Sequence, residues 1–189
     1  FSDMSMLTIL GAVLAAHLIG SEFEDRTIQH LISSGYGRFQ IVASSFINFW
    51  FASIFIMLPY IVAALIALVT ETTISLGNAM LGFLNLLTAP GEVSIGKAIA
   101  LIATMTIIYI GQITFAGYIA ILLKKATFVI AIFYGLSFLS GQVAGIKNSI
   151  PALYNAFSIT PFGGEYIALH PLASTNTIVS AIIVSISFI

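Results

Sequence analysis

Long apolar runs separated by short polar stretches make up most of this chain. An α-helix needs about 20 apolar residues to cross a hydrocarbon core of about 30 Å, and several runs reach that length. The run over residues 41–69 exceeds it, and Pro59 inside that run predicts a kink. We predict five membrane-spanning helices, over residues 4–21, 41–69, 97–123, 126–146 and 174–189. We also expect another span before Phe1 and a continuation of the last span beyond Ile189.

One polar stretch, residues 21–38, interrupts the apolar pattern early in the chain and holds five of its 13 charged residues (six Lys or Arg plus seven Asp or Glu). Ser21 and Glu24 have the spacing of a capping box, which starts a helix. Gly35 and Gly37 predict its end, because glycine accepts the left-handed conformation found there. A stripe at helical spacing lies between these signals: Phe23, Thr27, Leu31 and Ser34, with Ile28 and Ile32 alongside. The pattern predicts a short amphipathic helix over residues 22–34.

Two other connections have apolar patterns of their own. Between residues 70 and 96, Leu76, Met80, Phe83, Leu84 and Leu87 predict a short helix on the membrane surface. Residues 148–172 are apolar but broken by three prolines and a Gly-Gly pair, so no uninterrupted part is long enough to span. Because freed backbone groups need protein or water partners, two short helices dipping into one leaflet are predicted there. On the fourth span, small residues at four-residue spacing predict close helix contact: Ser137, Gly141 and Gly145.

Composition supports a membrane setting for these elements. The chain has 189 residues, of which 59% are hydrophobic and 7% charged, whereas a soluble domain has about 25% charged residues. The formal net charge of −1 gives no field that would attract nucleic acid. The chain contains no cysteine, which excludes disulfides and thiolate chemistry. The predicted fold class is an all-α, polytopic membrane protein with a cytosolic helix and an extracellular re-entrant segment.

The distribution of lysine and arginine predicts the orientation. Arg26, Arg38, Lys124 and Lys125 belong to connections on one side, and Lys97 and Lys147 belong to the other. This bias predicts a multi-pass protein of the plasma membrane with residues 22–38 and 124–125 in the cytosol.

Motifs for catalysis are missing from the sequence. There is no His-Glu-x-x-His helix, no Gly-x-Ser-x-Gly elbow and no glycine-rich phosphate loop followed by lysine. His17, His30 and His170 are predicted at different levels, where they do not converge on one metal. We therefore expect no enzyme active site and no ATP site in this chain. The polar stretch is either a solvated loop whose charges set topology or a docking helix, and its apolar stripe and paired helix stops favour docking.

The order of residues in and after that stretch resembles the signature of the type-2 permeases of ATP-binding-cassette exporters, in particular those that export lantibiotics, bacteriocins and other antimicrobial peptides. The matching positions are Glu22-Phe23, Thr27-Ile28, Leu31-Ile32, Arg38, Ile41 and Ala43-Ser44. Two positions depart from the signature. Gly35 stands where proline is frequent, and Ser45 replaces a usual lysine, which weakens one expected cytosolic contact.

The resemblance implies partners and a mechanism. Such permeases pair as homodimers or heterodimers and associate with two cytosolic ATP-binding-cassette ATPase subunits, which carry the ATP and Mg; this chain is expected to hold no cofactor. Residues 22–34 would be the coupling helix, which sits in a cleft of the ATPase and moves when ATP closes it. The implied docking residues are Glu22, Phe23, Glu24, Asp25, Arg26, Thr27, Ile28, Leu31, Ile32 and Arg38.

The cargo is predicted only in outline. Spans with few charges, many aromatic residues and isolated amides suit an amphipathic or hydrophobic solute, and the resemblance implies a membrane-active peptide. Three amides are candidates for the translocation path: Asn48, Gln112 and Gln142. Two alternatives remain open, an ion-coupled transporter that uses His17 or Glu22 as a proton site and a non-transporting membrane sensor or scaffold.

Overall fold

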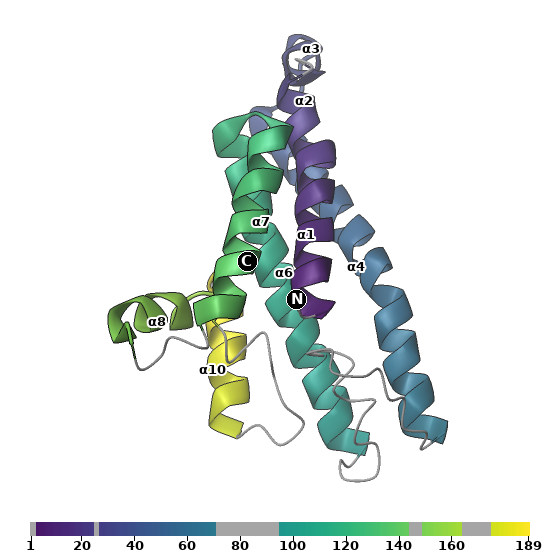
Figure 1. Cartoon of the computed structure of the whole chain (residues 1–189). Helices are drawn as coiled ribbons and strands as arrows, with labels where there is room; N and C mark the ends of the chain where they lie inside the picture. Colours follow the sequence, from purple (N-terminus) through teal and green to yellow (C-terminus); the bar gives the residue numbers. More distant parts are fainter. Residues whose placement is uncertain (1–2, 25–26, 71–94, 144–148, 164–174) are drawn as a thin grey trace.

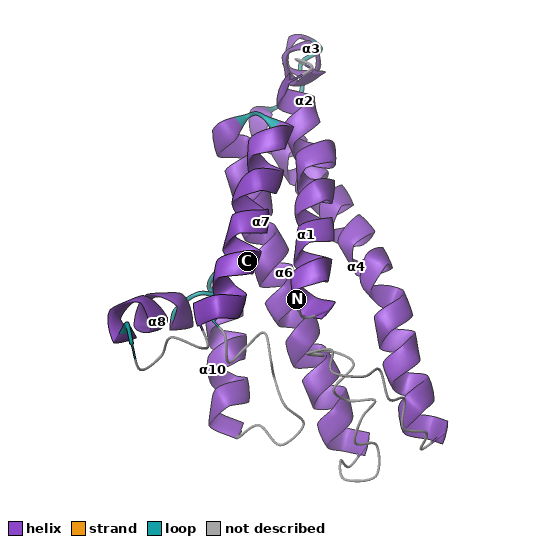
Figure 2. Cartoon of the chain, viewed as in Figure 1, coloured by secondary structure: helices purple, strands orange, loops and turns teal. Residues whose placement is uncertain are grey.

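The computed structural model describes residues 3–24, 27–70, 95–143, 149–163 and 175–189, and every regular element in these ranges is a helix (Figure 2). The predicted all-α class is therefore confirmed for these ranges. The elements are α1 (Asp3–Ala15), the π-helix η1 (Ala16–Gly20), α2 (Ser21–Glu24), α3 (Thr27–Ser33), α4 (Arg38–Thr70), α6 (Ile95–Leu123), α7 (Ala126–Val143), α8 (Pro151–Ser158) and α10 (Thr175–Ile186).

Three helical segments are long and apolar enough to cross a membrane: Met6–Phe23, Arg38–Ala63 and Ile99–Leu123. Two shorter apolar segments, Ala126–Ser140 and Thr175–Ile186, correspond to the fourth and fifth predicted spans. The apolar runs thus fold as helices, and three of these reach the length needed to cross a membrane within the described residues; five membrane crossings stay a prediction. The predicted surface helix over 76–87, the end of the fourth span and residues 164–172 of the re-entrant segment lie outside the described residues.

Helix α6 lies at the centre of the bundle, packed against α1, α4, α7 and α10 (Figure 1). Most of its positions between Leu101 and Ala120 are buried, as expected for an apolar helix inside a bundle. Its buried apolar residues are Leu101, Ile102, Met105, Ile108, Tyr109, Ile113, Ala116 and Ala120. The helix therefore carries much of the core, whereas α8 projects sideways from the bundle and none of its residues is buried.

Helix α4 is attached along a single narrow stripe. Its buried residues are spaced four apart: Ile41, Ser45, Phe49, Ser53 and Met57. Beyond Met57 no described residue of α4 is buried, and the helix diverges from its neighbours in Figure 1. Pro59 lies on the exposed side and does not end the helix, which continues to Thr70. The kink predicted at Pro59 stays a prediction.

Aromatic side chains join the later segments to the core. Phe115 of α6 packs against Phe133 of α7, Phe162 and Phe188, with ring centroids 5.9–6.0 Å apart. Phe162 also packs against Phe133 at 5.7 Å. Such pairs add roughly 0.5–1.5 kcal/mol each beyond simple burial. The cluster fixes the segment that follows α8, and the residues that follow α10, against the middle of α6.

A close helix contact lies between α6 and α4. A Cβ on Gly117 would lie 2.6 Å from the ring of Phe46, so glycine is what lets α6 approach α4. Ser137 on α7 is buried, but the burial of Gly141 is not described and Gly145 lies outside the described residues, so the contact predicted for these three positions stays a prediction.

Candidate functional site

Residues 21–24 and 27–45 form a hairpin that projects from one end of the bundle, and we call these residues the apex hairpin. It consists of α2, α3 and the first two turns of α4, and it connects the first long apolar helix to the second. Figure 1 shows it above the level where the other helices turn. The polar stretch is therefore a folded helical unit.

The ascending side of the apex hairpin is continuous with α1. Ser21 has helical dihedral angles (φ −65°, ψ −34°), and its backbone N–H donates to the carbonyl of Ala16, the five-residue spacing of a π-helix. The Ser21 hydroxyl donates to the carbonyl of His17. The prediction that Ser21 caps a new helix is therefore wrong, because its hydroxyl bonds backwards within a helix that continues. Helices α1, η1 and α2 therefore follow one another without a break.

The far end of α3 is closed by a Schellman motif. Gly35 has φ +94°, its N–H donates to Ile32 (3.0 Å), and the N–H of Tyr36 donates to Leu31 (3.2 Å). The helix end predicted at Gly35 is confirmed. Gly37 instead begins the next helix: its N–H donates to the side chain of Gln40 at 3.3 Å, three residues on, as in half of a capping box.

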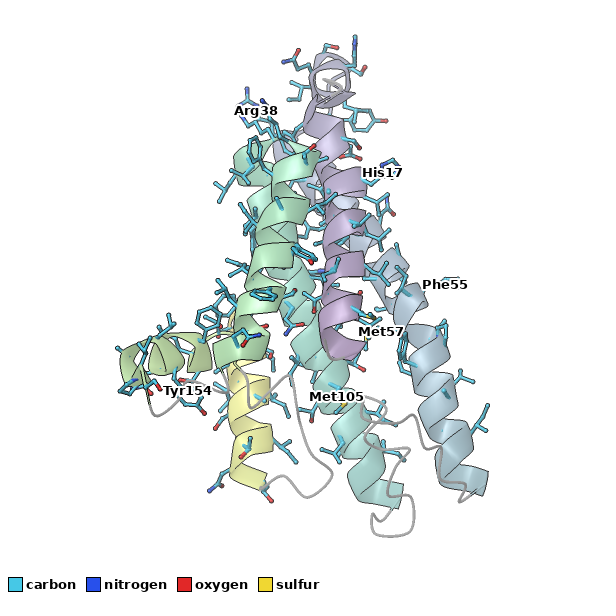
Figure 3. All side chains as sticks on the ribbon, in the orientation of Figure 1. His17, Arg38, Phe55, Met57, Met105 and Tyr154 are labelled. Carbon is cyan, nitrogen blue, oxygen red and sulfur yellow. The ribbon has the colours of Figure 1, made fainter. Side chains whose placement is uncertain are left out.

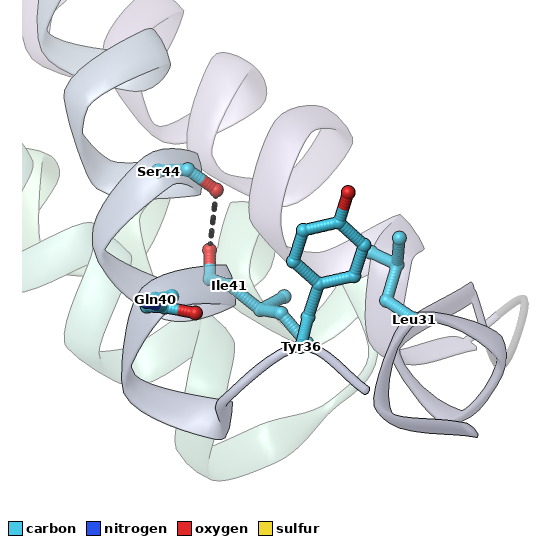
Figure 4. Close-up of a pocket in the computed structure, with 5 residues that line it drawn as sticks. All are labelled: Leu31, Tyr36, Gln40, Ile41 and Ser44. Atoms are coloured by element: carbon cyan, nitrogen blue, oxygen red, sulfur yellow. Dashed lines mark hydrogen bonds between the residues drawn. The ribbon is translucent and has the colours of Figure 1, made fainter. Parts of the chain in front are cut away.

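An open pocket of about 380 Å³ lies between the end of α3 and the start of α4 (Figure 4). Its lining is mostly apolar with two polar side chains, and comprises Leu31, Tyr36, Gln40, Ile41 and Ser44. The Schellman motif brings Leu31 and Tyr36 together, since apolar residues at these positions meet across the cap. The Ser44 hydroxyl already donates to the carbonyl of Ile41 at 2.8 Å. The pocket is suited to receiving an apolar side chain, and it contains no nucleophile paired with a base.

A hydrogen bond ties the two sides of the apex hairpin together. The hydroxyl of Ser45 on α4 donates to a carboxylate oxygen of Glu22 on α2 at 2.6 Å, and also contacts the carbonyl of Ile41 at 3.1 Å. Ser45 is buried, and Glu22 is half-buried. Hydrogen bonds to an ionised group are among the stronger ones. Ser45, which departs from the permease signature, therefore bonds to Glu22, one of the positions that match it. The spacing of the two residues in the sequence did not predict this contact.

The predicted docking residues divide into three groups. Leu31 and Ile32 are half-buried on α3, and Arg38 is exposed at the start of α4. Phe23 packs against the bundle core below the pocket-lining set. The helices contain Glu24, Thr27 and Ile28 at positions whose side chains are not described, and Asp25 and Arg26 lie outside the described residues.

The three path amides are not brought together within this chain. Gln112 is buried, accepts from Thr8 at 2.6 Å and donates to the carbonyl of Pro161 at 2.8 Å, so it joins α1, α6 and the segment after α8. Asn48 is exposed on α4, and Gln142 is exposed near the end of α7 (Figure 3 shows the side chains on the ribbon). A path lined by all three stays a prediction.

Trp50 makes a contact that the sequence pattern did not indicate. Its side chain is half-buried, and its indole N–H donates to the hydroxyl of Thr114 on α6 at 3.1 Å. Among the described residues, no three His, Cys, Asp or Glu side chains are grouped to hold a metal ion.

No protein-family model, curated protein or solved structure matches this chain.

Proposed function

We propose that this chain is the membrane-embedded permease subunit of an ATP-driven exporter and that its apex hairpin docks on a cytosolic ATPase. The observation that carries the proposal is the pocket between α3 and α4, an apolar recess on a projecting hairpin joined to two long apolar helices. A connection that only set topology would need no Schellman closure, no Glu22–Ser45 tie and no recess. The resemblance of residues 22–45 to the permease signature supplies the class of partner.

The contacts of the apex hairpin suggest how force would pass into the membrane. A push on α3 reaches α4 through Leu31, Tyr36 and Ile41, which line one pocket. It reaches α1 through the continuous helix of η1 and α2. A partner shifts such a conformational equilibrium only when it binds one state better than the other, so ATP-driven closure has to change the fit at this pocket.

In this proposal the chain spans the plasma membrane several times, with residues 22–38 and 124–125 in the cytosol and the segment after α7 on the outside. Two ATPase subunits hold the ATP and Mg, and a second permease chain completes the translocation path. The substrate class is an amphipathic or hydrophobic peptide. The weakly attached, aromatic outer face of α4 supports a path or partner surface there, since it includes the exposed Phe51 and Phe55.

Purification of the tagged full chain from its native membranes tests the proposal. A nucleotide-binding ATPase subunit should co-purify with the chain, and Leu31→Asp should remove it, because a carboxylate in the pocket opposes an apolar side chain. The matched control is Leu153→Asp on α8, the same change on a short helix near the other end of the bundle, which should leave the ATPase bound.

Absence of any nucleotide-binding protein from the purified wild-type complex would contradict the exporter. Transport that persists without ATP and collapses with the proton gradient would support an ion-coupled transporter instead.

A further inference from the structure

The connection between α6 and α7 consists of two exposed lysines, Lys124 and Lys125. Lys124 has φ +52° and is the one non-glycine residue with positive φ among those described, while its N–H donates to Ala120 at 3.0 Å. Left-handed backbone is unfavourable for a residue with a Cβ, and glycine would adopt it freely. A lysine at this position therefore lowers the stability of the fold, because its exposed side chain makes no packing contact with the described residues of the bundle that offsets the backbone strain.

Apolar side chains are exposed directly beside the two cations. Leu122 is 78% exposed and Phe128 is 55% exposed, so hydrophobic surface continues up to the turn. The ammonium of Lys125 lies 5.9 Å from the centroid of the Phe128 ring. A lysine over an aromatic ring next to open apolar surface is the arrangement found where a helix leaves hydrocarbon for the headgroup layer.

The basic turn is held in a fixed place. Ala126, the first residue of α7, packs against Gly20 of η1, where an added Cβ would lie 3.4 Å from the Ala126 Cα. Among the described residues no acid forms an ion pair with Lys124 or Lys125. Two unpaired positive charges thus stand side by side on a rigid, short connection, at the end of the bundle from which the apex hairpin projects (Figure 1).

We propose that Lys124 and Lys125 bind the phosphate headgroup of an anionic phospholipid in the cytosolic leaflet. Charge complementarity favours a phosphate, and the exposed Leu122 and Phe128 favour a phosphate attached to acyl chains over a free ion. A protein partner is disfavoured because the two-residue turn forms no helix or recess of its own and does not project past the exposed apolar side chains beside it. The site rests on the proposed membrane orientation but uses no residue of the apex hairpin, so it stands whether or not an ATPase docks there.

Native mass spectrometry of the detergent-solubilised full chain tests this site with phosphatidylglycerol and phosphatidylcholine as probes. Wild type should retain phosphatidylglycerol preferentially. Each lysine near a membrane surface contributes about five-fold to binding of anionic lipid, so Lys124→Gly combined with Lys125→Gln should weaken phosphatidylglycerol binding by roughly 25-fold. Glycine preserves the left-handed turn, and Lys125→Arg, which preserves the charge, should retain the lipid.

The matched control is Lys97→Gln, compared with Lys125→Gln alone, so that each variant loses one positive charge and the two positions lie at opposite ends of α6. It should leave phosphatidylglycerol binding unchanged. An equal loss in this control would show a general effect of net charge and overturn the site. Equal retention of phosphatidylcholine, or displacement of phosphatidylglycerol by inorganic phosphate alone, would also overturn it.

Discussion

Two connections at the same end of the bundle both reverse the chain through a residue with positive φ, but they differ in that residue and in shape. The apex hairpin reverses the chain with Gly35 at φ +94°, and the basic turn reverses it with Lys124 at φ +52°. The first projects, has its own helices and forms a recess, whereas the second is two residues long and level with exposed apolar side chains. In the proposed function, the first connection is reached from the cytosol and the second stays at the bilayer surface.

Substitution at the contact between these two regions should have the largest effect on the free energy of unfolding. Gly20 below the apex hairpin packs on Ala126 beside the basic turn, with room for a methyl group and nothing larger. Gly20→Leu should lower the free energy of unfolding by about 1–3 kcal/mol, because overpacking forces α7 away from η1. Gly20→Ala is the control and should be nearly neutral. Thermal unfolding followed by the fluorescence of Trp50, the single tryptophan, measures both variants.

The closure of α3 should be the next most sensitive feature. Gly35→Ala introduces a Cβ that meets no neighbouring atom, so its effect is conformational strain of about 1–2 kcal/mol. The strain should open the Schellman motif locally and speed hydrogen exchange of the Tyr36 amide by roughly 5- to 30-fold. Unchanged exchange at Tyr36 would mean that the cap does not hold the pocket together.

A smaller effect is expected from the tie across the apex hairpin. Ser45→Ala removes the hydroxyl that donates to Glu22, which should lower stability by about 1 kcal/mol, at the low end for a charged partner because Glu22 is partly exposed to water. Ser44→Ala is the matched control, since the Ser44 hydroxyl bonds only within its own helix turn. Equal losses in both variants would show that the bond to Glu22 is not a link between α2 and α4.

The basic turn should respond with the opposite sign. Lys124→Gly should raise stability by about 0.5–1 kcal/mol, because relief of left-handed strain exceeds the added entropy of the unfolded chain. The same residue change that stabilises the fold is expected to weaken retention of anionic lipid. A stability loss on Lys124→Gly would contradict the claim that the lysine is kept at a conformational cost.

Sequence reasoning was effective where one stretch of chain determines its own structure. The apolar runs are long enough to require helices, and Gly35 ends α3 because the left-handed position favours glycine. It failed where distant residues decide. Three features depend on partners that sequence spacing does not identify. They are the π-helix before Ser21, the hydrogen bond from Ser45 to Glu22, and the burial of Gln112 between Thr8 and Pro161. Gln112 has a hydrogen-bond partner for each of its two polar atoms inside this bundle.

The central claim is that the pocket of the apex hairpin receives a cytosolic ATPase, and site-specific photocrosslinking tests it most directly. A photoreactive amino acid at Leu31, in cells that contain the native partners, should give one product that contains a nucleotide-binding ATPase subunit. The same group at Leu153 on α8 should not give that product. Crosslinks from Leu31 that contain no nucleotide-binding protein, or the same product from both positions, would contradict the account.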